Sequence, residues 1–174
     1  DNHQRYVPLN HISKSQKNNS SAIYISLFGS FATLLLSLFV WYSLDLTSAD
    51  FQFLEEKAWI NDFIKFKLGV DGISILFIVL TTLITPICII SCINSVKDRV
   101  KEFLIAILVL ETFMIGVFCS LDLVVFYLFF EAGLIPMFLI IGVWGGPKRV
   151  YSAFKFFLFT LLGSVLMLVA IIAI

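Results

Sequence analysis

The sequence predicts an all-α integral membrane protein with five transmembrane helices, and three observations support this. The chain of 174 residues is 60% hydrophobic and 14% charged, whereas soluble domains are roughly one quarter charged. Its apolar residues fall into five runs, each long enough to cross a hydrocarbon core of roughly 30 Å. These runs are continuous rather than alternating. In lipid that pattern favours helices, which satisfy their own backbone hydrogen bonds.

The chain divides into a polar N-terminal tail, residues 1–21, and a transmembrane helical domain, residues 22–174. The tail has no apolar core of its own, so we expect it to be an extended segment. One long extramembrane loop, residues 45–71, interrupts the helical domain. The expected spans cover about residues 22–44, 72–93, 103–121, 123–143 and 152–174.

The long loop contains two segments, residues 51–59 and 63–68, that alternate partly between apolar and charged residues. Such alternation is typical of half-exposed strands, so we expect a hairpin with residues 60–62 as its turn. An interfacial helix is the alternative. Asp71 directly precedes the next span and is expected to cap it, because its carboxylate can accept hydrogen bonds from unpaired N–H groups.

Basic residues are divided unevenly between the two sides of the membrane. Of the 12 Lys and Arg residues, one side carries eight, the opposite side carries three, and Lys155 lies in the last span. The positive-inside rule therefore places the tail in the cytoplasm or matrix. The eight are Arg5, Lys14, Lys17, Lys97, Arg99, Lys101, Lys148 and Arg149.

Glu131 departs furthest from the apolar pattern, because it lies near mid-bilayer depth in the fourth span. A bare charge there costs about 3 kcal/mol on insertion scales, so such groups usually face a partner, a water-filled cavity or an ion path. Tyr127, one turn earlier, offers a hydroxyl on the same face. Pro136 removes a backbone hydrogen bond near Gly133, which predicts a local bend or a gap for water.

Three further charged residues lie in or beside the spans. Glu111 in the third span is a candidate proton carrier, or a protonated acid bonded to a nearby carbonyl. Lys155 is either an interfacial anchor whose long stem reaches the headgroups, or a proton relay or counter-charge. Asp122 joins the third and fourth spans and is expected to be a helix cap or turn residue. The candidate residues for proton translocation are therefore Glu131, Glu111 and Lys155.

No cofactor or metal site is expected in this chain. Cys88, Cys92 and Cys119 lie in or at the edge of apolar runs without an accompanying His, which favours small apolar fillers over metal ligands. The sequence contains neither a Gly-rich nucleotide loop nor a cysteine set for an iron–sulfur cluster. A net charge of zero and the lack of a basic block argue against nucleic acid as a partner.

Four motifs follow one another in order, at residues 69–74, 121–137, 141–146 and 155–164. Together they resemble NADH dehydrogenase subunit 4, an antiporter-like membrane-arm subunit of respiratory complex I, in its mitochondrial or alphaproteobacterial version. The likeness extends from about residue 22 to the end. The resemblance implies that the five helices form part of an antiporter-like helical bundle. It also implies proton translocation coupled to quinone reduction elsewhere.

The family's key glutamate, in the motif Phe-Glu-x-x-Leu-Ile-Pro-Met, falls on Glu131. Its usual partner in the family is a lysine in the helix that would follow this chain's last one. Lys155 belongs to the family's Lys-Phe-Phe motif, which is a different position. The five spans correspond to the family's second to sixth helices. We therefore expect an N-terminal portion that contributes Glu131, and Glu111, to a proton half-channel completed by a chain carrying the lysine helix.

The resemblance further implies a subunit of NADH:ubiquinone oxidoreductase, a translocase, with no redox chemistry in this chain. NADH, FMN, iron–sulfur clusters and ubiquinone are expected in partner subunits. The expected partners are other membrane-arm subunits of complex I and lipids. The expected location is the mitochondrial inner membrane, with a bacterial plasma membrane as the alternative, and the tail lies on the matrix or cytoplasmic side.

Two alternative functions stay open. A subunit of a multi-subunit cation/proton antiporter or of a membrane-bound hydrogenase would share the Glu and Pro-Met motif, and only its partners would differ. A non-catalytic structural membrane subunit is the second alternative. It predicts that Glu131→Gln leaves proton pumping intact, while loss of the whole chain prevents assembly.

Overall fold

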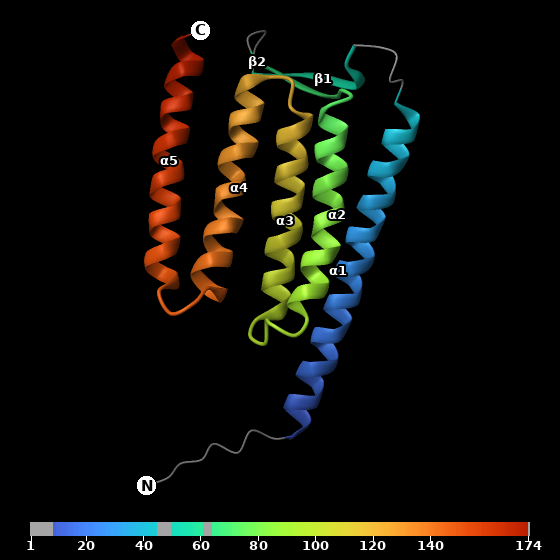
Figure 1. Cartoon of the computed structure of the whole chain (residues 1–174), viewed down its shortest axis with the longest axis vertical. Helices are drawn as coiled ribbons and strands as arrows, with labels where there is room; N and C mark the ends of the chain where they lie inside the picture. The colour runs from blue at the N-terminus through green and yellow to red at the C-terminus, as the bar shows by residue number, and fades with distance from the viewer. Residues whose placement is uncertain (1–8, 45–49, 61–63, 174) are drawn as a thin grey trace.

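The computed structural model describes residues 9–44, 50–60 and 64–173, which form five helices and one β-hairpin (Figure 1). All five helices are long and apolar enough to cross a membrane, so the predicted fold class is confirmed. The elements in chain order are α1 (Leu9–Ser43), β1 (Gln52–Ile60), β2 (Ile64–Val70), α2 (Ser74–Cys92), α3 (Val100–Cys119), α4 (Leu123–Trp144) and α5 (Arg149–Ala173).

The helices stand side by side in sequence order, and each runs antiparallel to the one before it (Figure 1). Each packs against its neighbour in the chain, and α1 also contacts α3. The hairpin, the α3–α4 connection and the end of α5 lie at one end of the bundle, which we call the hairpin end. The start of α1 and the α2–α3 and α4–α5 connections lie at the other, the tail end.

Among the described residues the buried core is small, and most of its residues fall into two clusters. Most outward apolar side chains stay exposed, and Phe159 is 81% exposed. Such wide apolar faces are stable only against lipid or neighbouring membrane helices. The cluster at the hairpin end contains Leu44, Val70, Ile75 and Ile78, and the second contains Ile89, Val100 and Leu104.

The predicted hairpin is confirmed, and the alternative of an interfacial helix is wrong. Strands β1 and β2 pair antiparallel, with Glu56 opposite Lys67. The backbone N–H of Leu121 donates to the Lys67 carbonyl at 3.1 Å, which attaches the hairpin to the α3–α4 connection. Residues 61–63, which contain most of the predicted turn, lie outside the described residues.

The predicted extended tail is wrong for residues 9–21, because α1 begins at Leu9 and is 35 residues long. A helix that has nucleated in its apolar part gains one hydrogen bond for each further residue, so it propagates outward at little cost. Neither proline nor glycine occurs between Leu9 and Phe28 to stop it. Residues 1–8 of the tail lie outside the described residues.

Two aspartates cap helices as predicted. Asp122 Oδ1 accepts hydrogen bonds from the backbone N–H of Val124 at 2.8 Å and of Val125 at 3.3 Å, at the start of α4. Asp71 Oδ1 accepts from the N–H of Ile73 at 3.1 Å and of Ser74 at 2.6 Å. Removing such a cap costs about 1 kcal/mol, so both connections at the hairpin end are locally stabilised.

We expect the start of α2 to loosen in acid through Asp71. The pKa of the Asp71 carboxyl lies below its ordinary value, chiefly because the carboxylate accepts the Ser74 N–H. The stability from this cap is therefore present above the ordinary pKa and is lost as the pH falls through the lowered, folded-state pKa. Hydrogen exchange of the peptide containing Ile73 and Ser74 measures this loss.

The variant Asp71→Asn keeps an acceptor oxygen but does not titrate. Its exchange protection, compared with the unmodified chain at each pH, should lack the acid-dependent loss. Asp98→Asn, in the exposed α2–α3 connection, is the matched control and should behave like the unmodified chain. Equal acid sensitivity of the Asp71→Asn variant and the unmodified chain would contradict the expectation.

Candidate functional site

Polar side chains of all five helices lie at a similar depth in the bundle, in a zone that we call the polar layer. Glu111 lies eight residues before the end of α3, and Glu131 lies eight residues after the start of α4. Because the two helices are antiparallel, both glutamates lie about 12 Å from the hairpin end. The layer contains Thr33 and Ser37 of α1, Thr82 and Thr85 of α2, Glu111 of α3, Tyr127 and Glu131 of α4, and Ser164 of α5.

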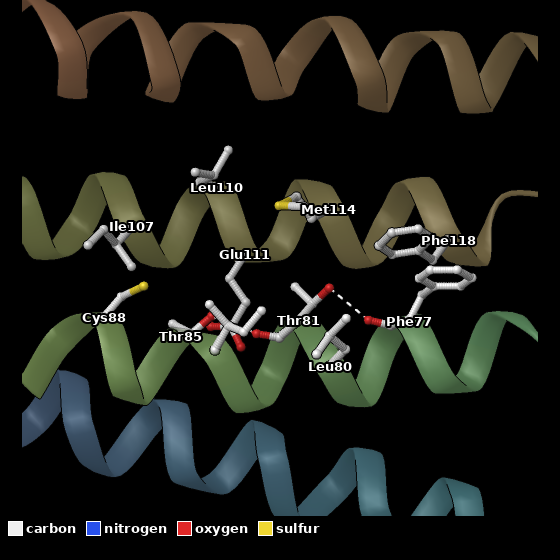
Figure 2. A pocket seen from close by; sticks show the side chains of 11 residues that line it. Phe77, Leu80, Thr81, Thr85, Cys88, Ile107, Leu110, Glu111, Met114 and Phe118 are labelled. Atoms are coloured by element: carbon white, nitrogen blue, oxygen red, sulfur yellow. Dashed lines mark hydrogen bonds between the residues drawn. The ribbon is translucent and has the colours of Figure 1, made fainter.

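Glu111 is held at the meeting point of three helices. Its side chain is 5% exposed, and its Oε1 accepts a hydrogen bond from Thr33 Oγ1 of α1 at 3.2 Å. Thr85 of α2 also lies beside the Glu111 carboxyl, and both residues border one cavity (Figure 2). Hydrogen bonds such as the one from Thr33 offset the cost of removing a carboxyl from water.

Figure 2 shows Glu111 reaching from α3 toward α2, beside Thr85 and Thr81. It borders a cavity of about 250 Å³ between these helices, which also reaches Cys88. The cavity walls are otherwise apolar, so the carboxyl and the two threonine hydroxyls are the groups that could hold a water molecule there.

A second hydroxyl pair ties α1 to α2 within the layer. Ser37 Oγ and Thr82 Oγ1 lie 2.8 Å apart, and the two residues are 6% and 1% exposed. Each hydroxyl also reaches a carbonyl of its own helix, Leu34 at 2.8 Å and Val79 at 3.0 Å. This pair extends the polar layer from Glu111 toward the hairpin end.

Glu131 forms the other half of the layer, between α4 and α5. The Ser164 hydroxyl donates to Glu131 Oε1. Ser164 is 3% exposed, whereas Glu131 is half-buried. The Tyr127 side chain lies beside those of Glu131 and Ser164, so the prediction that Tyr127 shares a face with Glu131 is confirmed.

Ser164 and Thr33 were not singled out in the sequence. A lone serine or threonine in an apolar span carries no signal of its own, because such residues also bond their own helix carbonyls harmlessly. One available signal was depth: Ser164 lies nine residues before Ala173 at the end of α5, which places it near the level of Glu131.

Lys155 is not brought to either glutamate. It lies nine residues before Ser164, about 13.5 Å toward the tail end, and its side chain is exposed. Its Nζ lies 6.0 Å from the centre of the Tyr151 ring, at the limit of a cation–π contact. Among residues 9–44, 50–60 and 64–173 the structure gives it no ion pair with Glu111 or Glu131. This position favours the interfacial anchor over the counter-charge.

The helix α4 runs unbroken through Pro136. A cavity of about 400 Å³ lies beside Pro136, between α3 and α4. Apolar side chains form nearly all of its wall, including Ala132, Ile135 and Leu139. A cavity with so few polar partners does not favour water.

Within the described part of the chain, no group of three or more His, Cys, Asp or Glu residues could hold a metal ion. The three cysteines are half-buried thiols. The polar layer therefore consists of hydroxyl and carboxyl groups, and carboxyl groups are those that can take up and release protons near neutral pH when their surroundings tune them.

Comparison with known families gives two matches that together cover nearly the whole chain. Residues 7–117 match the family described as "NADH-ubiquinone oxidoreductase chain 4, amino terminus". Residues 120–174 match the family described as "NADH:quinone oxidoreductase/Mrp antiporter, TM". The second match contains Glu131 and Ser164, and the first contains Glu111 and Thr33.

Curated relatives agree with these families. The chain is 58% identical over 153 residues to NADH-quinone oxidoreductase subunit M of Rhodobacter capsulatus, covering 88% of this chain and 30% of that protein. It is 51% identical over 150 residues to NADH-ubiquinone oxidoreductase chain 4 of Marchantia polymorpha, covering 85% of this chain and 30% of that one. The chain thus spans about 30% of the length of these relatives.

A solved structure has the same arrangement of helices. It is a chain of the respiratory complex I from Thermus thermophilus with bound NADH, with a TM-score of 0.72 and 28% sequence identity. The match covers 86% of this chain and 31% of that one.

Proposed function

This chain belongs to the NADH-ubiquinone oxidoreductase chain 4 family, and we propose that it forms part of the proton-translocating membrane arm of an NADH:quinone oxidoreductase. The observation that carries this proposal is the polar layer, in which Glu111 and Glu131 lie at one depth inside an otherwise apolar bundle. Intramembrane carboxyls are costly, and they typically mark proton or ion paths.

In this proposal, Glu131 and Glu111 each bind and release a proton, and the hydroxyl groups beside them hold the carboxyls in place. The two glutamates belong to adjacent helices, and the layer runs across the bundle from α1 to α5. A proton would thus travel within the plane of the membrane between these helices. In this proposal Lys155 contributes only a positive charge near the membrane–water interface at the tail end.

The chain is about 30% as long as its relatives, so we propose that other helices complete the path. By its family resemblance, Glu131 would meet a lysine carried by a helix that follows α5. NADH oxidation, FMN, iron–sulfur clusters and ubiquinone belong to partner subunits, and lipids cover the outer faces. The excess of basic residues at the tail end supports a matrix or cytoplasmic location for that end. The membrane would be the mitochondrial inner membrane or a bacterial plasma membrane.

Purification of the native membrane complex that contains this chain, with mass spectrometry of every subunit, tests the proposal. We expect NADH-oxidising and iron–sulfur subunits, together with a polypeptide segment that carries the lysine helix. A complex that contains this chain but has no NADH-oxidising subunit would contradict the proposal.

A second candidate has specific support, because the family matched by residues 120–174 includes Mrp antiporters. In that case the same carboxyls would serve a cation/proton antiporter without NADH chemistry. The same purification would then recover only membrane antiporter subunits, and vesicles containing the complex would exchange Na⁺ for protons without NADH.

A further inference from the structure

The hydroxyl beside Glu111 has two possible acceptors. Thr33 Oγ1 lies 2.8 Å from the carbonyl oxygen of Ser30, one turn earlier in α1, and 3.2 Å from Glu111 Oε1. A hydroxyl carries a single proton and can also accept hydrogen bonds. Thr33 can therefore donate fully to only one of these two oxygens at a time.

Each of these two hydrogen bonds suits a different protonation state of Glu111. When the carboxyl is ionised, Thr33 turns its proton toward the carboxylate. When the carboxyl is protonated, Glu111 donates its own proton to Thr33 Oγ1, and Thr33 donates to the Ser30 carbonyl. A rotation of one O–H bond separates the two arrangements, and neither leaves the carboxyl without a partner.

Ser164 has the same arrangement at Glu131. Its Oγ lies 2.9 Å from the Leu161 carbonyl oxygen of its own helix, and it is also hydrogen-bonded to Glu131 Oε1. Ser164 is on α5 and Thr33 is on α1, so the pattern occurs on two separate helix pairs. In both, a buried or half-buried carboxyl meets a hydroxyl that can turn back to its own backbone.

We propose that Thr33 and Ser164 are positioning residues that keep Glu111 and Glu131 hydrogen-bonded in both protonation states. This inference rests on the proposed function and deepens it. A buried polar group is costly when it has no hydrogen-bond partner, so a carboxyl bonded in only one protonation state would be held in that state. A carboxyl that must repeatedly take up and release a proton works best when it has hydrogen-bond partners in both its protonated and its ionised state.

Other groups around the carboxyls set the size of the expected effects. Glu111 also meets Thr85, whose Oγ1 lies 3.0 Å from the Thr81 carbonyl oxygen, and the Cys88 thiol lines the same cavity. Thr85 could partly replace Thr33. Beside Glu131 lies the titratable hydroxyl of Tyr127. In the described ranges no Lys or Arg forms an ion pair with either glutamate. We therefore expect a larger effect at Ser164 than at Thr33.

The test uses paired variants in the assembled membrane complex that contains this chain. Thr33→Val and Ser164→Ala remove the hydroxyl, whereas Thr33→Ser and Ser164→Thr retain it. Matched controls are Thr112→Val in α3 and Thr160→Val in α5. In the described contacts, each control hydroxyl donates only to a carbonyl of its own helix, at 2.9 Å for Thr112 and 2.8 Å for Thr160.

Two readouts are recorded for every variant: the infrared C=O band of each protonated carboxyl during a pH titration, and the pH profile of proton pumping. Bands are assigned by their loss in Glu111→Gln and Glu131→Gln. We expect Thr33→Val and Ser164→Ala to shift the frequency of the corresponding band and to move its titration midpoint, by about one pH unit at Ser164, a tenfold change in proton affinity. The hydroxyl-retaining variants should restore both values, and the controls should not change them.

Unchanged bands and midpoints in Thr33→Val and Ser164→Ala would overturn the inference, as would failure of the hydroxyl-retaining variants to restore them in a complex that assembles normally. The proposed function fails differently. If Glu131→Gln leaves pumping intact while the bands still respond to Ser164→Ala, the positioning role stands and the proton-path role falls.

Discussion

Glu131→Gln is expected to reduce proton pumping by the assembled complex about tenfold or more, because an amide cannot take up and release the proton that a carboxylic acid carries. Glutamine has nearly the same shape and retains an oxygen that accepts the Ser164 hydroxyl, so packing between α4 and α5 should persist. The loss would therefore reflect chemistry rather than misfolding. Pumping is measured in reconstituted vesicles as acidification on addition of NADH and quinone.

The matched control is Glu102→Gln in the first turn of α3. Its side chain is 54% exposed and paired with Arg99 at the surface, where an ion pair contributes little. This variant should pump normally. Normal pumping by Glu131→Gln as well, in a fully assembled complex, would instead favour the structural-subunit alternative.

Gly116→Val is expected to have the largest effect on assembly, by separating α3 from α4. A Cβ atom at Gly116 would lie 2.6 Å from two ring carbons of Phe129 and 2.9 Å from its Cγ. Because Cγ is also too close, turning the ring does not relieve the overlap, and the helices must move apart. Overpacking of this kind costs about 1–3 kcal/mol.

The expected result is a lower Tm of the purified complex and a smaller fraction of the chain assembled into it. Phe129 lies two residues before Glu131, so the displaced helix should also lower pumping in the complexes that do assemble. Gly163→Ala in α5 is the control, because nothing lies within 4 Å of a Cβ added there. Alanine is the better helix former, so this variant should be as stable or slightly more stable. An unchanged Tm for Gly116→Val would contradict the packing of α3 against α4.

Much of the fold follows from local sequence patterns. Continuous apolar runs predict the spans, alternation predicts the hairpin, and Asp71 and Asp122 stand where helix caps are needed. The prediction of an extended tail is wrong for residues 9–21, and the reason is also local. A polar composition does not stop a helix that lacks proline or glycine. For Lys155 the sequence leaves two roles open, because the distance between its side chain and Glu131 depends on which helices face one another.

The sequence by itself determined that the described part of the chain has five helices long and apolar enough to cross a membrane, which family it resembles and which carboxyls lie in the apolar runs. These features depend on the free energy of transferring each residue from water to lipid, and that free energy is a property of each segment by itself. Only the tertiary structure decided that Thr33 meets Glu111 and that Ser164 meets Glu131. Such pairs require two helices at matching depth and rotation, and each hydroxyl alone is equally satisfied by its own backbone.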